Sequence, residues 1–314
     1  MKIVRLEEAA SKISSGQRLF VQGAAMTPNT LVNGICDRYK ELENVEVISM
    51  HTEGPVKYAL DPHRQSFKIN CCFVGGNVRA AVNTNQGDYI PIFLSEIHLL
   101  FKHDILPLDV AIIQVSPPDR HGFCSLGVSV DITLAALKYA KTVIAQVNPQ
   151  VPRTHGDGII HKDRIDFAIE VDEPIHELNN GHITEAEEKI GKHIANMIED
   201  GATLQMGIGS IPNAVLANLK GHSRLGIHTE MFSDGILPLV ESGVITGEDK
   251  KIKPGKIVSC FASGSRKLYD FLDDNPSVHF KEAAYTNHTG LIMRNPKVTA
   301  INIAIEIDLT GQVC

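Results

Sequence analysis

One pattern occurs twice along this sequence and limits the folds that the chain can adopt. In each copy a short strand leads to a glycine, and a Pro-Asn pair then opens a helix. The matching segments are Gly16-Gln-Arg-Leu, Gly23 and Pro28-Asn29 in the first copy, and Gly201-Ala-Thr-Leu, Gly207 and Pro212-Asn213 in the second. Pro28 and Pro212 are 184 residues apart, a period that indicates duplicated domains rather than a solenoid. Chance similarity between two strand–helix–strand units is the alternative.

A second pair of segments favours the duplication. Asp109-Val-Ala-Ile-Ile-Gln-Val, followed by Asp119, is matched by Val298-Thr-Ala-Ile-Asn-Ile, followed by Asp308, at an offset of 189 residues. Strands and helices also alternate along the whole chain, which is typical of parallel sheets with crossover helices. We therefore predict two similar open parallel-sheet α/β domains, and we expect the second to be incomplete at its C-terminus.

The boundary between these domains is expected after a stretch that differs from the rest. Residues 151–181 are polar and rich in proline, glycine and histidine. Thr184 and Glu187 then have the spacing of a capping box, which opens a predicted helix. The predicted domains are therefore residues 1–183 and 184–314.

Composition excludes several classes of function. The chain has 314 residues, 43% hydrophobic and 21% charged, as in ordinary globular proteins. Its net charge of −7 and pI of about 6.0 leave no basic surface for nucleic acid or an anionic membrane. No apolar run approaches the roughly 20 residues that a membrane-spanning helix needs.

The cysteines and histidines do not form a recognisable metal or disulfide motif. The six cysteines are scattered, and neither HExxH nor paired CxxC occurs, so no metal site is predicted. Cys260 and Cys314 are expected to be chemically inert. Without a signal peptide at the start, a reducing cytoplasm is the expected location.

The second copy of the pattern contains a glycine-rich turn between a strand and a helix. Thr203-Leu-Gln-Met is predicted to form a short buried strand that runs into Gly207-Ile-Gly-Ser-Ile211. Pro212 suits the first turn of the helix that follows, because its missing N–H has no helical partner there. Gly221 is placed to end that helix.

Glu230 is predicted to lie beside this turn. A second strand, residues 224–228, returns the chain to the same edge of the sheet just before Glu230. Neighbouring strands lie about 4.8 Å apart, and open α/β sheets bind ligands at the carboxyl ends of their strands. We therefore expect the Glu230 carboxylate to lie within reach of N–H groups of the 207–211 turn.

Five longer segments carry a family resemblance. They are Gln114-Val-Ser-Pro-Pro-Asp-Arg-His-Gly-Phe-Cys-Ser-Leu-Gly127, Gln146-Val-Asn-Pro-Gln-Val-Pro-Arg-Thr-His-Gly156, Gly207-Ile-Gly-Ser-Ile-Pro-Asn-Ala-Val215, Gly226-Ile-His-Thr-Glu-Met-Phe-Ser-Asp-Gly235 and Ile305-Glu-Ile-Asp-Leu-Thr-Gly-Gln-Val313. With them the chain resembles the acetyl-CoA hydrolase/transferase family, and within it the 4-hydroxybutyrate and butyrate:acetate CoA-transferases.

The resemblance implies a function and a set of site residues. It implies that Glu230 carries the acyl group and CoA, and that the turn contacts CoA through Gly207, Ile208, Gly209, Ser210 and Ile211. It also implies coenzyme A as a substrate, no tightly bound cofactor and a homodimer. Family members continue with a further strand and a Gly-Gly-Gln loop that lines the CoA site, and this sequence lacks that loop.

The implied chemistry is a ping-pong transfer of CoA from a short-chain acyl-CoA to a free carboxylate such as acetate. Glu230, ionised at pH 7 because a free glutamate titrates near 4.3, attacks the thioester and forms a mixed anhydride. The CoA thiolate then attacks the glutamyl carbonyl and gives a glutamyl-CoA thioester. Acetyl-, butyryl- and 4-hydroxybutyryl-CoA are all candidate donors, because such acids differ by only about 1–3 kcal/mol in a pocket.

Several sites compete with Glu230. Glu306 is also an acid where a strand meets a turn, and it ranks second. The turn at Gly207 is only a fragment of the GxGxxG fingerprint, with proline in the last position, which argues against a nicotinamide site. His121-Gly-Phe-Cys124 is half of a metal motif at most, and Gly75-Gly76-Asn77 is either part of a carboxylate pocket or a plain turn.

Two other functions stay open. One is an acyl-CoA hydrolase, such as an acetyl-CoA hydrolase, in which water accepts the acyl group. The other is a non-catalytic small-molecule-binding α/β module, as in regulatory proteins that resemble sugar-phosphate isomerases.

Overall fold

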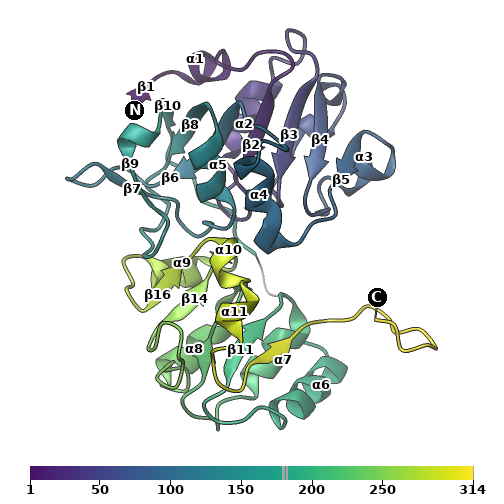
Figure 1. The fold of residues 1–314 in the computed structure, drawn as a ribbon, viewed down its shortest axis with the longest axis vertical. Coiled ribbons are helices and arrows are strands. Elements are labelled where there is room, and N and C mark those ends of the chain that lie inside the picture. Colours follow the sequence, from purple (N-terminus) through teal and green to yellow (C-terminus); the bar gives the residue numbers. More distant parts are fainter. Residues whose placement is uncertain (179–180, 182, 314) are drawn as a thin grey trace.

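The computed structural model describes residues 1–178, 181 and 183–313, and its two α/β units are stacked along the long axis (Figure 1). The first unit, purple to teal, contains one large sheet. The second unit, green to yellow, contains shorter parallel ladders. The predicted fold class, parallel α/β with two similar units, is confirmed, and the second sheet region is the smaller one. The boundary between residues 183 and 184 stays a prediction.

Within the described residues the large sheet has eight parallel strands in the order β1-β10-β8-β6-β2-β3-β4-β5. The bounds are β1 Lys2–Ile3, β2 Arg18–Val21, β3 Val45–Ser49, β4 Phe67–Cys71, β5 Gly87–Tyr89, β6 Val110–Val115, β8 Thr142–Val147 and β10 Phe167–Glu170. A small antiparallel pair, β7 Phe123–Ser125 with β9 Ile159–His161, lies outside this sheet. The sequence had indicated neither β5 nor this pair.

Helices cover both faces of the large sheet, and β6 shows why the chain folds this way. All six of its side chains are buried, as expected for a parallel strand covered on both sides. Ala111 and Ile113 belong to one apolar cluster, and Val110 and Ile112 belong to the other. The helices are α1 Leu6–Ala10, α2 Asn29–Cys36, α3 Arg79–Asn83, α4 Ile97–Lys102 and α5 Thr133–Tyr139, with 3-10 turns η1 Lys57–Ala59, η2 His63–Gln65, η3 Leu94–Glu96 and η4 Lys162–Arg164.

The second unit is built from short parallel ladders. Its strands are β11 Thr203–Met206, β12 Gly226–Ile227, β13 Met231–Phe232, β14 Ile257–Ser259, β15 Phe261–Ala262, β16 Val278–Phe280 and β17 Thr299–Ile301. Its helices are α6 Glu185–Ala195, α7 Ser210–Ala217, α8 Leu237–Glu241, α9 Arg266–Leu272, α10 Ala283–Thr286 and α11 Thr289–Ile292, with the 3-10 turn η5 Asp234–Ile236. No helix in the described ranges is long and apolar enough to cross a bilayer.

The repeat seen in the sequence is also a repeat of topology. β11 pairs with β12 on one side and β17 on the other, as β2 pairs with β3 and β6. The register agrees, because Leu204 lies opposite Thr299 where Leu19 lies opposite Val110. A bridge from His228 to β14, which pairs with β16, extends the series. The strand order β16-β14-β12-β11-β17 therefore repeats the order β5-β4-β3-β2-β6.

Local signals gave one accurate helix start and one wrong helix end. Thr184 and Glu187 form the predicted capping box at the start of α6. The helix after the glycine turn, α7, ends at Ala217 and not at Gly221. The side chain of Asn218 donates to the carbonyl of Ala214 (2.8 Å) and supplies the cap three residues earlier.

The two units meet through backbone hydrogen bonds. The N–H of Ala262 donates to the carbonyl of Val128 (2.9 Å), and the N–H of Ala283 donates to the carbonyl of Asp131 (3.0 Å). Gly156 pairs with Phe280 so closely that an added Cβ would lie 2.1 Å from the Phe280 oxygen. These contacts bring loops of the first unit, at residues 128–131 and Gly156, against the second unit, where the candidate site lies.

Candidate active site

The glycine turn lies between β11 and α7, as predicted. Gly209 has φ 122° and ψ −176°, a conformation that only glycine adopts without strain, and Pro212 lies in the first turn of α7. The N–H of Gly207 donates to the carbonyl of Ile301 in β17 (2.9 Å), so it is not available to a ligand. The hydroxyl of Ser210 donates to Glu187 in α6. The N–H groups of the first turn of α7 have no carbonyl within the helix to bond.

Glu230 follows β12 at the same edge. Leu204 and Ile227 are paired, and Gly207 and Glu230 each come three residues later, where the carboxyl ends of both strands lie. Thr229 joins the ends of β11 and β12. Its hydroxyl accepts from the N–H of Met206 (3.0 Å) and lies 3.1 Å from the Met206 carbonyl oxygen. The turn and the acid are therefore at one edge, as expected.

The side chain of Glu230 is half-buried and is held by an amide. Nδ2 of Asn287, just after α10, donates to Oε2 of Glu230 (3.0 Å). Among the described residues, Asn287 is the hydrogen-bond partner found for this carboxylate. The predicted contact with N–H groups of the 207–211 turn stays a prediction. Burial raises the pKa of Glu230, the Asn287 hydrogen bond opposes that rise, and the negative charge of Asp131 adds to it.

The first unit contributes Asp131 and His51 to this region. Asp131 is buried, and its carboxylate accepts hydrogen bonds from the hydroxyls of Ser129 (2.5 Å) and Thr133 (2.9 Å). The ring of His51, just after β3, lies 5.1 Å from the ring of Phe261. Burial lowers the pKa of His51, which favours the neutral ring, although the nearby Asp131 charge opposes this. Both groups come from the carboxyl edge of the large sheet or the loops beside it.

Sequence reasoning missed Asn287, Asp131 and His51 because no motif connects them to Glu230. Asn287 is 57 residues from Glu230 in the chain, and Asp131 and His51 belong to the other unit. The contribution of the first unit follows from contacts between loops of the two units, for which the sequence carries no local signal.

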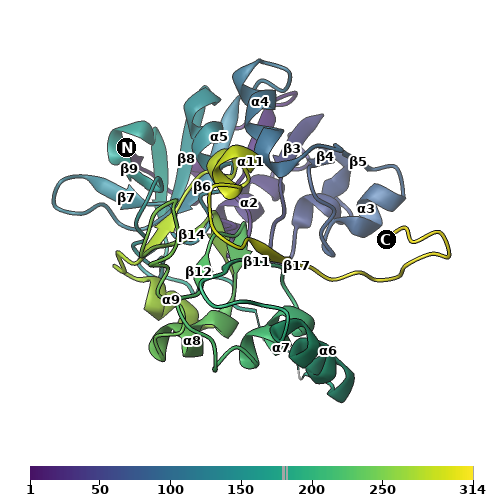
Figure 2. The same cartoon turned by 60° about the horizontal axis from the view of Figure 1, so that its bottom comes forward.

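The competing sites are separated from this cluster or have other partners. Glu306 is exposed in the segment after β17, which leaves the body of the molecule in both ribbon views (Figure 1, Figure 2). Asn77 donates to the carbonyl of Thr52 (2.7 Å) at the carboxyl edge of the large sheet. His121 is exposed while Cys124 is buried, and no three potential metal ligands gather within the described residues.

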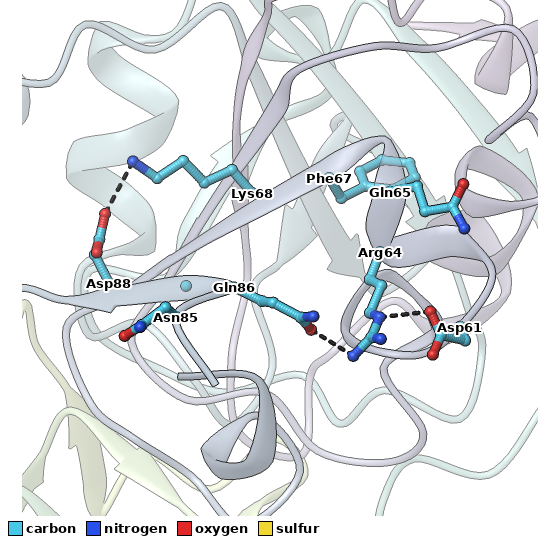
Figure 3. A pocket seen from close by; sticks show the side chains of 9 residues that line it. Asp61, Arg64, Gln65, Phe67, Lys68, Asn85, Gln86 and Asp88 are labelled. Atoms are coloured by element: carbon cyan, nitrogen blue, oxygen red, sulfur yellow. Dashed lines mark hydrogen bonds and ion pairs between the residues drawn. The ribbon is translucent and has the colours of Figure 1, made fainter. Parts of the chain in front are cut away.

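A cavity of about 450 Å³ lies away from this edge, at the amino ends of β4 and β5 (Figure 3). Its cationic side chains already have partners: Arg64 contacts Asp61 (2.5 Å) and Gln86 (2.6 Å), and Lys68 contacts Asp88 (2.9 Å). Because these charges are neutralised and Glu230 lies elsewhere, this cavity is not the candidate site.

Comparison with known proteins decides the family. The acetyl-CoA hydrolase/transferase N-terminal domain matches residues 1–178, and the C-terminal domain of the same family matches residues 264–314. This chain belongs to the acetyl-CoA hydrolase/transferase family. The resemblance inferred from the sequence is thereby confirmed, and the first matched range includes all eight strands of the large sheet.

Three relatives of this acetyl-CoA hydrolase/transferase family member are named CoA transferases. A succinyl-CoA:acetate/propanoyl-CoA:succinate CoA transferase of Fasciola hepatica is 47% identical over 98% of this chain and 64% of its own length. A 4-hydroxybutyrate coenzyme A transferase of Clostridium kluyveri is 45% identical over 100% of this chain and 73% of its own. The crystal structure of a 4-hydroxybutyrate CoA-transferase from Porphyromonas gingivalis superposes with a TM-score of 0.88 at 35% identity, over 99% of this chain and 75% of that one. The chain thus spans about two thirds to three quarters of these relatives.

Proposed function

We propose that this family member transfers CoA between a short-chain acyl-CoA and a free carboxylate, with Glu230 as the nucleophile. The observation that carries the proposal is the half-buried Glu230 carboxylate, which is held by Asn287 and follows β12 at the sheet edge where the glycine turn follows β11. Relatives at 45–47% identity are named CoA transferases, which supports the reaction class. Coenzyme A is then a substrate, and no tightly bound cofactor is proposed.

The proposed first half-reaction has two steps. An oxygen of the ionised Glu230 carboxylate attacks the thioester carbonyl carbon. The C–S bond breaks, CoA departs as its thiolate, and the acyl group stays on Glu230 as a mixed anhydride. The thiolate then attacks the glutamyl carbonyl carbon, the original acid leaves as its carboxylate, and a glutamyl-CoA thioester remains. A second carboxylate repeats these steps in reverse and departs as its CoA thioester.

The groups around Glu230 suit these steps. Each attack places negative charge on an oxygen, and a single well-placed donor there is worth roughly 3–4 kcal/mol. We propose that the N–H groups of Ile208 to Ile211 supply such donors. We also propose that residues Gly207 to Ile211 contact CoA. Partial burial of the carboxylate limits the access of water to the anhydride, which favours transfer over hydrolysis.

Trapping of the acyl-enzyme tests the nucleophile. The chain is treated with acetyl-, butyryl- or 4-hydroxybutyryl-CoA, quenched with hydroxylamine or borohydride, and digested for peptide mass analysis. We expect a modification on Glu230, none in Glu230→Gln, and an unchanged yield in Glu306→Gln, which removes an exposed acid. An unmodified Glu230 would favour the non-catalytic binding module.

Dependence on acetate separates the transferase from a hydrolase. We expect loss of the butyryl-CoA thioester to require added acetate and to yield acetyl-CoA in equal amount. Thioester loss at the same rate without acetate would contradict the transferase and establish hydrolysis.

A homodimer and a cytoplasmic location remain predictions, and light scattering of the purified chain tests the first.

A further inference from the structure

The main-chain carbonyl of Glu230 is held by an unusual set of donors. Its oxygen lies 2.9 Å from the N–H nitrogen of Cys260, 3.2 Å from that of Phe261, 2.9 Å from Oγ of Ser259 and 3.0 Å from Sγ of Cys260. A carbonyl oxygen has two lone pairs, so these four donors share one acceptor. The peptide unit that carries the proposed nucleophile is therefore held by three consecutive residues of a neighbouring segment, Ser259, Cys260 and Phe261.

This contact occurs where two adjacent strands are interrupted at the same level. Glu230 lies between β12 and β13, and Cys260 lies between β14 and β15. β13 pairs with β15, and His228 bridges to Val258 in β14. The interruption turns the Glu230 carbonyl toward Ser259 and Cys260 instead of into a regular ladder.

The chemical states of the two side chains agree with a donor role. Burial raises the pKa of the Cys260 thiol well above its ordinary value, so its sulfur keeps its proton and is a poor nucleophile. The hydroxyl of Ser259 is fully buried and lies 2.9 Å from the carbonyls of both Glu230 and Phe261. Because a hydroxyl has one proton, it donates to one of these oxygens at a time.

Cys260 also connects the nucleophile to the first unit. Its carbonyl accepts from the N–H groups of Val130 (3.0 Å) and Asp131 (3.1 Å). Asp131 has φ 24°, a strained value for a non-glycine residue, and such strain persists only where the surrounding contacts hold it. The 128–131 segment thus contacts one side of Cys260, and Glu230 contacts the other.

We propose that Ser259 and Cys260 are positioning residues that orient Glu230 through its carbonyl oxygen. Fixing that peptide plane fixes the direction in which the Glu230 side chain leaves the backbone and hence where its carboxylate meets a thioester. An error of about 1 Å in the placement of reacting groups can cost on the order of 100-fold in rate. The inference rests on the proposed function, because it assigns these two residues to the same reaction.

Single-turnover acylation of the full chain tests this role. The rate at which Glu230 is modified is measured against acyl-CoA concentration, which separates the maximal rate from the half-saturating concentration. We expect Cys260→Ala and Ser259→Ala each to lower the maximal rate about tenfold or more with little change in half-saturation. Cys260→Ser, which keeps a donor, should recover most of the loss, while Cys124→Ala, a buried thiol elsewhere, should be close to wild type.

The rescue distinguishes positioning from packing. A Cys260→Ser variant as slow as Cys260→Ala, or unchanged rates in both alanine variants, would overturn the inference. Melting temperatures of all variants are recorded. If Cys124→Ala loses as much rate per degree of lowered melting temperature as Cys260→Ala and Ser259→Ala do, the loss reflects packing and the inference is overturned.

Amide hydrogen exchange separates a failure of this inference from a failure of the proposed function. If the wild-type chain is not acylated, the proposed function fails, and exchange at the Cys260 and Phe261 amides decides the positioning contact. We expect protection of both amides in the wild type and faster exchange at these positions in Ser259→Ala. Rapid exchange at both amides in the wild type would show that the carbonyl is not held.

Discussion

Asn287 donates a hydrogen bond from Nδ2 to Oε2 of Glu230 across 3.0 Å. This contact joins the segment between β12 and β13 to the residue that follows α10. The amide stabilises the ionised form of the carboxylate, while burial and the Asp131 charge favour the protonated form. The balance of these effects sets how much of Glu230 is available as a nucleophile at a given pH.

Replacing Asn287 should make Glu230 harder to ionise. In Asn287→Ala the carboxylate loses a hydrogen bond to its charged form, worth about 1.5–3 kcal/mol, so the pKa of Glu230 rises. We expect slower acylation, by about tenfold or more below neutral pH, and an acidic limb of the pH–rate profile shifted to higher pH. Asn275→Ala, which removes an amide outside the site, is the control; an unshifted limb in Asn287→Ala would contradict the assignment.

Neutralising Asp131 should have the opposite effect on the same profile. Asp131→Asn removes a negative charge that raises the pKa of Glu230, so the acidic limb should move to lower pH. Asparagine tolerates positive φ better than most residues, which limits the backbone cost at φ 24°. A shift of the limb to higher pH would show that Asp131 acts on Glu230 in another way.

Removing the ionisable group should stabilise the fold at neutral pH. Burial raises the pKa of Glu230 in the folded state above the unfolded value near 4.3. The folded state therefore binds the proton more tightly, and stability is lost as pH rises from the unfolded pKa through the folded pKa. We expect Glu230→Gln to melt at a higher temperature than wild type at pH 7.5, with the gap closing toward about pH 4. Glu306→Gln should show no gap, and a gap independent of pH would contradict the argument.

Gly209 should not tolerate a side chain. Its φ of 122° and ψ of −176° cost a non-glycine residue about 1–3 kcal/mol, and an added Cβ would lie 3.0 Å from Cδ1 of Ile303. We expect Gly209→Ala to raise the half-saturating acyl-CoA concentration, because the turn must shift. Gly221→Ala, whose Cβ would meet nothing within 4 Å, is the matched control and should behave like wild type in the same titration.

The elements beside the site were predictable because their signals are local. The apolar run Val110–Val115, the glycine–proline turn before α7 and the capping box at Thr184 each depend on residues within a few positions of one another. The end of α7 was predicted wrongly because a side chain, that of Asn218, ended the helix before Gly221 could.

The partners of Glu230 had no such signal. In the sequence Asn287 is only the first residue of an Asn-His-Thr triplet, and Cys260 is one of several scattered cysteines. Both residues reach Glu230 because separate strands of the second unit are interrupted at the same level and α10 packs beside them.

The α/β class, the duplicated strand–helix pattern and the placement of Glu230 and the glycine turn at one sheet edge could be inferred from the sequence alone. These follow from hydrophobic period and from glycine and proline geometry, which act over short distances along the chain. The groups that surround the Glu230 carboxylate and hold its carbonyl are brought together by tertiary packing. Burial, charge and hydrogen bonding act through space, and the residues that supply them here are far apart in the chain and come from both units.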